Sequence, residues 1–295
     1  MRRITLLTNP DVCNLRCPLC FLNQRNRPFG MGEMPIEVAR AAIERYAGLN
    51  APAQERLREV IPSTMGEPLL YSKFRELLDY CRALGIPMNL TTNGTFPGFW
   101  GTETGMAYLL EACSDIKVSC MGFDVATFTE MMPGMSFDTW KGNVLGLLKV
   151  RDGMRKEGKK PASVSMQVTL HKKMVTHVVE LLSWAEEIGI DRIKWNLLVF
   201  ISAGKSLAQE YGVDRESVQE LRRIIRSGKL SCEGSLFFDG HRISEDECLF
   251  KDEVWIMPDG SEEKCPNPER RFGDRAACGA KCEGCLLLNP VGAAI

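Results

Sequence analysis

Apolar and polar positions follow two different periods through the first two hundred residues of the chain. Short apolar runs predict strands, and apolar residues that recur every three or four positions predict helices. Strands are expected over 3–8, 58–63, 86–94, 115–120, 163–170 and 191–200. Helices are expected over 35–49, 73–85, 103–112, 138–157, 175–189 and 214–228. Strands that alternate with helices form parallel sheets with right-handed crossovers, so the pattern predicts an α/β fold.

The number of strand–helix units limits the architecture. Six units fill about two hundred residues, whereas a closed eight-unit barrel usually takes about 250 residues. We therefore predict a partial (β/α)6 TIM-like barrel. Beyond Leu230 the sequence changes to short strands, turns and cysteines. The predicted organisation is a barrel over 1–205, a linker helix over 206–235 and a small cysteine-rich C-terminal domain over 236–295.

Three residues are predicted to mark helix ends. Pro35 has a fixed φ and no N–H, which suits the first turn of the helix that it begins. Gly85 suits the left-handed position just after a helix. Asp214 can accept a hydrogen bond from a free N–H at the start of the last expected helix.

Composition and charge exclude several classes of protein. Apolar residues make up 44% and charged residues 25% of the 295, close to globular averages, which disfavours a disordered or fibrous chain. A net charge of −1 gives no broad basic field for nucleic acid or an anionic membrane. There is no apolar run of about 18 residues and no signal-peptide core. We expect a cytoplasmic protein whose partners include neither nucleic acid nor membrane.

Twelve cysteines are many for an intracellular chain, and their crowding favours metal binding or catalysis over disulfides. One group near the start comprises Cys13, Cys17 and Cys20. A second group near the end comprises Cys248, Cys265, Cys278, Cys282 and Cys285. Two groups so far apart in the sequence predict two metal sites.

The first group lies in DVCNLRCPLC (11–20), directly after the first expected strand. The carboxyl ends of the strands are where a β/α barrel builds its active site. Structural zinc and ordinary four-iron clusters take four protein ligands, so three thiols leave one metal position open. A zinc knuckle or a set of buried free thiols is the alternative.

The stretch CNLRCPLCF resembles the cluster motif of the radical S-adenosylmethionine (SAM) enzymes, with Phe21 directly after the third cysteine. A second match is TMGEPLL (64–70), at the end of the second expected strand. In that family a G-E-P motif at this place binds the amino group of SAM. The resemblance assigns this role to Gly66, Glu67 and Pro68. A carboxylate that faces an ammonium group is physically sensible.

The resemblance implies a 4Fe-4S cluster held by Cys13, Cys17 and Cys20, with an open iron that binds SAM. An electron from the reduced cluster cleaves SAM into methionine and a 5′-deoxyadenosyl radical, which abstracts hydrogen from a C–H bond. The electron is expected from a donor such as flavodoxin or ferredoxin.

By the same resemblance, polar residues at later strand ends contact the ribose and carboxylate of SAM. The candidates are Thr92, Asn93, Ser119 and Gln167. Each has a second interpretation, in which the side chain satisfies backbone groups at a strand end. Asn93 also precedes Gly94, which suits a turn.

The C-terminal cysteines resemble the auxiliary-cluster domains, called SPASM or twitch, that follow many radical SAM barrels. Cys248 and Cys265 flank Gly260, and CEGC (282–285) matches the last two ligands of the short twitch form. The resemblance implies an auxiliary 4Fe-4S cluster on Cys248, Cys265, Cys282 and Cys285. Cys278 is left over, or it replaces Cys248. A zinc ribbon is the alternative.

The compact barrel, the single auxiliary cluster and the overall size resemble the radical SAM epimerases and dehydrogenases of aminoglycoside antibiotic biosynthesis. The cluster motif starts at residue 13, which leaves no room for an N-terminal peptide-binding domain and favours a small-molecule substrate, an amino-sugar. Epimerisation is expected, with a cysteine thiol as hydrogen donor. Dehydrogenation by an oxidoreductase is the alternative. The candidate donors are Cys120, Cys232 and Cys248, each of which also suits a buried apolar position.

A cationic amino-sugar needs carboxylates nearby, and Asp124 and Asp239 are the candidates, although most acidic residues only solvate a surface. Two other functions stay open. One is a radical SAM enzyme that modifies a ribosomal peptide with a separate leader-binding partner. The other is a non-enzymatic iron–sulfur carrier or zinc scaffold.

Overall fold

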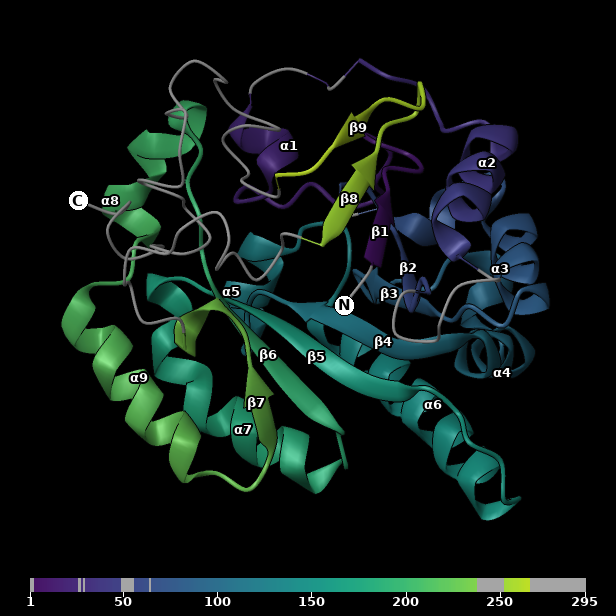
Figure 1. The fold of residues 1–295 in the computed structure, drawn as a ribbon. Helices are drawn as coiled ribbons and strands as arrows, with labels where there is room; N and C mark the ends of the chain where they lie inside the picture. Colours follow the sequence, from purple (N-terminus) through teal and green to yellow (C-terminus); the bar gives the residue numbers. More distant parts are fainter. Residues whose placement is uncertain are drawn as a thin grey trace.

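A curved parallel sheet forms the centre of the molecule (Figure 1). The computed structural model describes residues 3–25, 28, 30–48, 56–63, 65–237 and 252–265. Within these ranges the sheet has nine strands, in the order β7-β6-β5-β4-β3-β2-β1-β8-β9. The strands are β1 (Arg3–Leu6), β2 (Glu59–Pro62), β3 (Met88–Thr92), β4 (Cys113–Cys120), β5 (Ser163–Leu170), β6 (Arg192–Leu197), β7 (Ser231–Glu233), β8 (Glu253–Ile256) and β9 (Glu262–Glu263). The predicted α/β fold with an open, barrel-like parallel sheet is confirmed.

The six expected helices are present and lie around the outside of the sheet, as Figure 1 shows. They are α2 (Ile36–Ala47), α3 (Phe74–Ala83), α4 (Glu103–Ala112), α6 (Phe137–Lys156), α7 (Val178–Glu187) and α9 (Arg215–Ser227). Three shorter helices were not expected: α1 (Phe21–Gln24), α5 (Val125–Met131) and α8 (Ala208–Tyr211). Within the ranges described, no helix combines the length and the apolar character needed to cross a membrane.

The predicted helix ends are largely confirmed. Gly85 has a φ of 67° after α3 and donates its N–H to the carbonyl of Arg82 at 3.0 Å, which closes the helix. The carboxylate of Asp214 accepts from Ser217 N–H at 2.8 Å and so caps α9. Pro35 is the N-cap of α2 and not its first residue. The difference is one position, because the extended ψ of Pro35 keeps it outside the helix.

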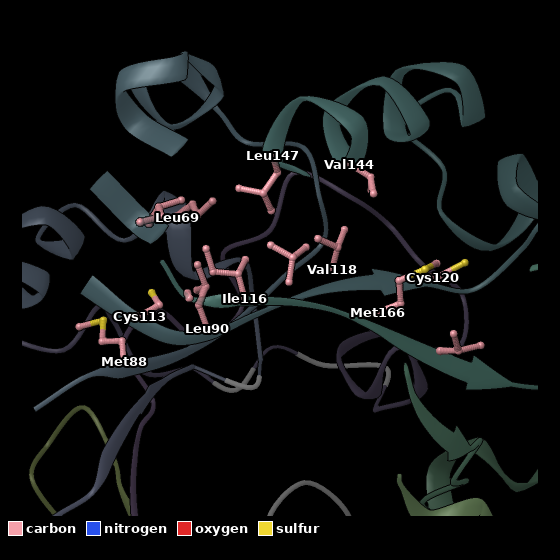
Figure 2. Close-up of a cluster of buried hydrophobic side chains, with 14 of the residues drawn as sticks. Leu69, Met88, Leu90, Cys113, Ile116, Val118, Cys120, Val144, Leu147 and Met166 are labelled. Atoms are coloured by element: carbon pink, nitrogen blue, oxygen red, sulfur yellow. The ribbon is translucent and has the colours of Figure 1, made fainter. Parts of the chain in front are cut away.

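The face of the sheet beneath the helices is apolar. Figure 2 shows Leu90, Ile116, Val118 and Met166 of the strands beneath Leu147 of α6. All of these side chains are fully buried. Burial of such side chains contributes about 1.5–3 kcal/mol each, so this layer stabilises the sheet against its helices.

The other face, the inner face of the barrel, is polar. Side chains alternate between the two faces of a strand, which places Asp115 and Lys117 of β4 on the side opposite Ile116. The carboxylate of Asp115 pairs with Lys117 and with Arg192, each at 2.9 Å, and accepts from Ser165 Oγ at 2.7 Å. Burial opposes ionisation, but these partners outweigh it and lower the pKa of Asp115. Asp115, Lys117 and Arg192 therefore form a group of paired charges in the barrel interior.

The described part of the predicted C-terminal domain joins the barrel sheet. Strand β8 pairs in parallel with β1, with Arg3 opposite Glu253. Strand β9 returns antiparallel to β8 through a turn in which Gly260 has a φ of 82°. This hairpin agrees with the short strands and turns expected beyond Leu230. The limits of a separate auxiliary domain stay a prediction, because most of 236–295 lies outside the described residues.

Candidate active site at the carboxyl ends of the strands

Two sequence motifs meet at the carboxyl ends of the first three strands. The cysteine loop (7–20) leaves β1, Gly66 follows β2 and Asn93 follows β3. Because the carboxyl ends of parallel strands share one edge, segments up to 80 residues apart in sequence become neighbours here. Hydrogen bonds join the three segments, so the two motifs form one assembly.

The three N-terminal thiols influence one another. Leu15 N–H donates to Sγ of Cys13 at 3.4 Å, and Cys20 N–H donates to the carbonyl of Cys17 at 3.1 Å. Burial raises the pKa of all three thiols, and the other two thiols raise that of Cys17 further, to about 12. Such sulfurs lose their protons at neutral pH when a metal supplies the opposing positive charge.

The donor chemistry of this loop fits an iron–sulfur cluster. Soft thiolates are the ligands of iron–sulfur clusters, zinc and copper(I), and three of them leave one position of a four-iron cluster open. Among the described residues, no group of three or more Cys, His, Asp or Glu side chains is arranged to hold a single metal ion. The residues that would hold a cluster are Cys13, Cys17 and Cys20.

The backbone of Glu67 joins the G-E-P loop to the cysteine loop. Its N–H donates to the carbonyl of Val12 at 2.8 Å, and its own carbonyl accepts from Nδ2 of Asn9 at 2.7 Å. Gly66 permits this approach, because it has a φ of 84° and a Cβ there would lie 2.5 Å from the Asn9 carbonyl oxygen. The G-E-P loop therefore packs directly on the segment that leads into Cys13.

The carboxylate of Glu67 is buried and joins the same loop to β3. It accepts from Thr92 Oγ1 at 2.8 Å, Asn93 N–H at 2.7 Å and Leu69 N–H at 3.3 Å. Burial raises its pKa to about 7, against the opposing effect of these three donors. The resemblance assigned Glu67 to the amino group of SAM. In the structure both of its oxygens already accept hydrogen bonds from the chain itself.

We expect Glu67→Gln to lower the free energy of unfolding by about 1–3 kcal/mol, because an amide nitrogen would replace one acceptor among three donors in a buried site. Chemical denaturation measures the change. Glu44→Gln is the matched control, since Glu44 accepts a hydrogen bond from Tyr80 at the surface. Equal effects of the two substitutions would contradict the role assigned to Glu67.

The other cofactor candidates lie at the same end or near it. Ser119 and Gln167 are register partners on β4 and β5, and Gln167 is in turn opposite Lys194 on β6. Alternation along the strands places all three on the inner face with Lys117. Pro68 begins a 3₁₀ turn directly after Glu67. Phe21 begins α1 and packs against an apolar cluster, comprising Leu7, Met65, Ile201 and Trp255.

Two of the three candidate hydrogen donors lie on the other side of the sheet. Cys120 is fully buried, and Figure 2 shows it in the layer of apolar side chains beneath α6. Cys232 is opposite the buried Ile193 and accepts a hydrogen bond from Trp195 Nε1 at 3.4 Å. Because side chains alternate between faces, neither thiol reaches the inner face. Their role as hydrogen donors stays a prediction, which this placement does not favour.

We expect Cys120→Ala to leave turnover within about twofold of the parent protein, because the thiol does not face the barrel interior. The substitution should still cost about 1–2 kcal/mol of stability, since it removes a buried atom from a packed layer. Product formation and thermal unfolding measure the two effects separately. A loss of turnover with unchanged stability would restore Cys120 as a hydrogen donor.

Asp124 has a structural role that the sequence did not indicate. Its Oδ1 accepts from Ala126 N–H at 2.9 Å and caps α5, and its Oδ2 lies 2.9 Å from His177 Nε2. These partners lower its pKa, against the effect of burial. Asp124 is thus already paired within the protein, which does not favour the predicted contact with a cationic substrate.

Several predicted site residues fall outside the described residues. They are Asp239, Cys248, Cys278, Cys282 and Cys285. Cys265 is described and lies two residues after the end of β9, with its N–H 3.4 Å from a carboxylate oxygen of Glu263. The ligand set of an auxiliary cluster therefore stays a prediction.

Two buried side chains that support the cysteine loop were not expected. Asn9 holds the G-E-P loop through the carbonyl of Glu67. Gln24 of α1 donates to the carbonyls of Leu19 and Val199, and its Oε1 accepts from Ile201 N–H at 3.0 Å. Nothing in the local sequence indicates either role, because all of these partners except Leu19 lie 58 to 177 residues away.

A family model and several known proteins are similar to this chain. Residues 10–151 match the model of the radical SAM superfamily. Two curated proteins are similar to this chain: Fe-coproporphyrin III synthase of Methanosarcina barkeri, 27% identical over 223 residues, and pre-heme d1 synthase of Dinoroseobacter shibae, 24% identical over 222 residues. The matches cover 75% of this chain and 51% and 50% of those proteins. The chain thus spans about half the length of the curated relatives it matches.

The fold is also similar to that of SuiB from Streptococcus suis. SuiB bound to precursor peptide SuiA has a TM-score of 0.66 and 18% identity, and the match covers 95% of this chain and 61% of SuiB. SuiB bound to S-adenosylmethionine gives the same TM-score. The segment that matches the family model contains both motifs of the site. The similarity of this chain to the radical SAM superfamily model therefore lies in residues 10–151, a little under half of the chain.

Proposed function

We propose that this protein is a radical SAM enzyme that abstracts a hydrogen atom from a substrate bound inside the barrel. The main support is that hydrogen bonds join the cysteine loop, the G-E-P loop and the end of β3 at the carboxyl ends of the strands. Cys13, Cys17 and Cys20 would hold a 4Fe-4S cluster with one open iron. When bound, this cluster supplies the electron that cleaves SAM and yields a 5′-deoxyadenosyl radical.

The chain's own residues position the cofactors. Gly66 and Glu67 fix the loop that would face the methionyl end of SAM, next to Cys13. Ser119 and Gln167 on the inner face offer a hydroxyl and an amide to its ribose and carboxylate. An external one-electron donor, such as flavodoxin or ferredoxin, is part of the proposal.

We propose a peptide as the substrate, in place of the amino-sugar expected from the sequence. None of the similar proteins described above is named for an amino-sugar, and SuiB was solved with a precursor peptide. The ammonium group of Lys194 has no hydrogen bond or ion pair within the described ranges, and burial and Lys117 lower its pKa. This inner-face cation favours a carboxylate of a peptide and disfavours a cationic sugar.

A tetrapyrrole is the second candidate substrate. The two curated relatives are named for coproporphyrin and heme d1 chemistry, and they match the chain more closely in sequence than SuiB does. A coproporphyrin also carries several carboxylates, which the inner-face cation would accommodate.

We further propose an auxiliary 4Fe-4S cluster at the β8–β9 hairpin. Cys265 lies two residues after the end of β9, and Gly260 lies in the turn of the hairpin. The ligands would be Cys248 or Cys278, with Cys265, Cys282 and Cys285. Four protein ligands would leave no open iron, so this cluster would serve electron transfer. The double substitution Cys282→Ala and Cys285→Ala should lower iron content by about half, and unchanged iron would exclude the site.

The test of the proposed function is anaerobic incubation of the iron-loaded protein with SAM and a strong reductant. Separate reactions contain an acidic peptide library, coproporphyrin III or an aminoglycoside panel. Mass spectrometry then measures 5′-deoxyadenosine and any change in substrate mass. We expect cleavage of SAM in all reactions and a modified product from the peptides. A product from coproporphyrin III alone would favour a tetrapyrrole as the substrate. Absence of SAM cleavage in every reaction would contradict the proposal that the protein is a radical SAM enzyme.

A further inference from the structure

Asn93, in the turn after β3, contacts both motifs of the site. Its side-chain Nδ2 lies 3.7 Å from Sγ of Cys13, within the range of a hydrogen bond to sulfur. Its backbone N–H donates to Oε2 of Glu67 at 2.7 Å. One residue therefore joins a cluster-ligand sulfur to the G-E-P loop.

The orientation of the Asn93 amide follows from its neighbours. The backbone N–H of Thr95 can only donate, and it lies 2.9 Å from Oδ1 of Asn93. Oδ1 must therefore face Thr95, which leaves the amide NH₂ to face Cys13 and Asn14. Oδ1 of Asn14 accepts from the same NH₂ at 2.8 Å, and Nδ2 of Asn14 donates to Thr95 Oγ1 at 2.9 Å. The NH₂ group is fixed toward the sulfur by this network.

The other hydrogen bonds given to these thiols come from the backbone. Leu15 N–H donates to Cys13, and the backbone of Leu22 donates to Cys20. In the part of the chain that the structure describes, Asn93 is the side chain that donates to a thiol of the cysteine loop. Hydrogen bonds to ligand sulfurs stabilise the more negative, reduced state of an iron–sulfur cluster and so raise its reduction potential.

We propose that Asn93 is a positioning residue that sets the reduction potential of the N-terminal cluster through its hydrogen bond to Cys13. The inference rests on the proposed function, since it requires a cluster on Cys13, Cys17 and Cys20. Through its backbone contact with Glu67, the same residue also holds the G-E-P loop against the cysteine loop. Asn93 therefore contacts both the cluster ligand Cys13 and the loop proposed to bind SAM.

The experiment uses two substitutions that keep an acceptor for Thr95 N–H and remove the donor to the sulfur. Asn93→Ser retains a hydroxyl oxygen for the turn. Asn93→Asp retains a carboxylate oxygen and directs a second one toward Cys13. Asn23→Ala is the matched control, because Nδ2 of Asn23 donates to the carbonyl of Cys17 at 2.5 Å and not to a sulfur.

Each protein is loaded with iron and sulfide, and the signal of its reduced cluster is followed by electron paramagnetic resonance during a redox titration. For Asn93→Ser we expect the ratio of reduced to oxidised cluster at a fixed potential to fall about tenfold, a shift of about 59 mV for one electron. Asn93→Asp should shift the potential further in the same direction, because a negative charge faces the sulfur. Asn23→Ala should leave the potential unchanged.

The outcomes separate the inference from the proposed function. Clusters that load in both Asn93 variants with the parent potential would show that the residue only forms a turn, which overturns the inference. A parent protein that binds no cluster would overturn the proposed function and the inference with it. If the variants fail to load a cluster, pulsed electron paramagnetic resonance on the parent protein, labelled with ¹⁵N in its asparagine side chains, tests the inference instead. A hyperfine coupling to the cluster supports the inference, and its absence overturns it.

Discussion

Cys17→Ser is expected to abolish SAM cleavage and to remove about four iron atoms from each reconstituted chain. Burial raises the pKa of the Cys17 thiol, and the nearby thiols of Cys20 and Cys13 raise it further, to about 12. A serine hydroxyl ionises far less readily than a thiol and is a hard ligand, so it does not replace a soft thiolate. Changes beside a metal ligand already cost about 10–100-fold in affinity or activity, and loss of the ligand should exceed that. Iron analysis and the rate of 5′-deoxyadenosine release measure the two effects.

Cys81→Ala is the matched control for this substitution. Cys81 is a buried thiol of α3 in the apolar layer of the barrel, and burial raises its pKa to about 12 as well. We expect this variant to lose some stability but to keep its iron and its SAM cleavage. If Cys17→Ser kept full iron content, or if Cys81→Ala lost as much, the assignment of the first cysteine group would be wrong.

Gly66→Ala is expected to lower the free energy of unfolding by more than about 2 kcal/mol and to abolish SAM cleavage. The φ of 84° costs an alanine about 1–2 kcal/mol by itself. A Cβ there would also lie 2.5 Å and 2.6 Å from the carbonyl oxygens of Asn9 and Val12, which are backbone atoms with little freedom to move. The substitution would push the G-E-P loop away from the cysteine loop. Chemical denaturation measures the loss of stability, and the rate of 5′-deoxyadenosine release measures the loss of SAM cleavage.

Gly85→Ala is the control that separates the backbone strain of a positive φ from the steric clash of an added Cβ. Gly85 also has a positive φ, 67°, but a Cβ there would meet nothing within 4 Å. We expect it to cost about 1 kcal/mol and to leave SAM cleavage unchanged, because only the strain of a left-handed alanine applies. Equal losses in the two variants would mean that the contact between the loops does not matter.

Local pattern predicted the regular elements well. The helix expected over 103–112 and the strand over 163–170 coincide with α4 and β5, and the remaining ends differ by a few residues. The parallel order followed because alternating strands and helices leave few other topologies. Helix α5 was missed, since its short sequence carries little periodic signal. The pairing of β8 with β1 was also missed, because it depends on contacts about 250 residues apart in sequence.

The features of the site that could be predicted are those that lie in contiguous sequence, and those that depend on distant contacts could not be predicted. The three thiols and the G-E-P loop could be predicted because each motif is contiguous in the sequence. The face on which Cys120 lies could have been predicted, since polar Asp115, Lys117 and Ser119 occupy the alternate positions of the same strand. The partners of the Glu67 carboxylate could not be predicted, because Thr92 and Asn93 meet it only after β2 and β3 have paired.

The central claim is that Cys13, Cys17 and Cys20 hold a cluster with an iron open to SAM. The most direct measurement is the electron paramagnetic resonance spectrum of the reduced cluster, with and without SAM, in a protein that carries Cys282→Ala and Cys285→Ala to remove the proposed auxiliary signal. We predict a four-iron signal that changes when SAM is added and that disappears when Cys17→Ser is introduced. A signal that is unchanged by SAM, or a colourless protein loaded with zinc, would contradict the account.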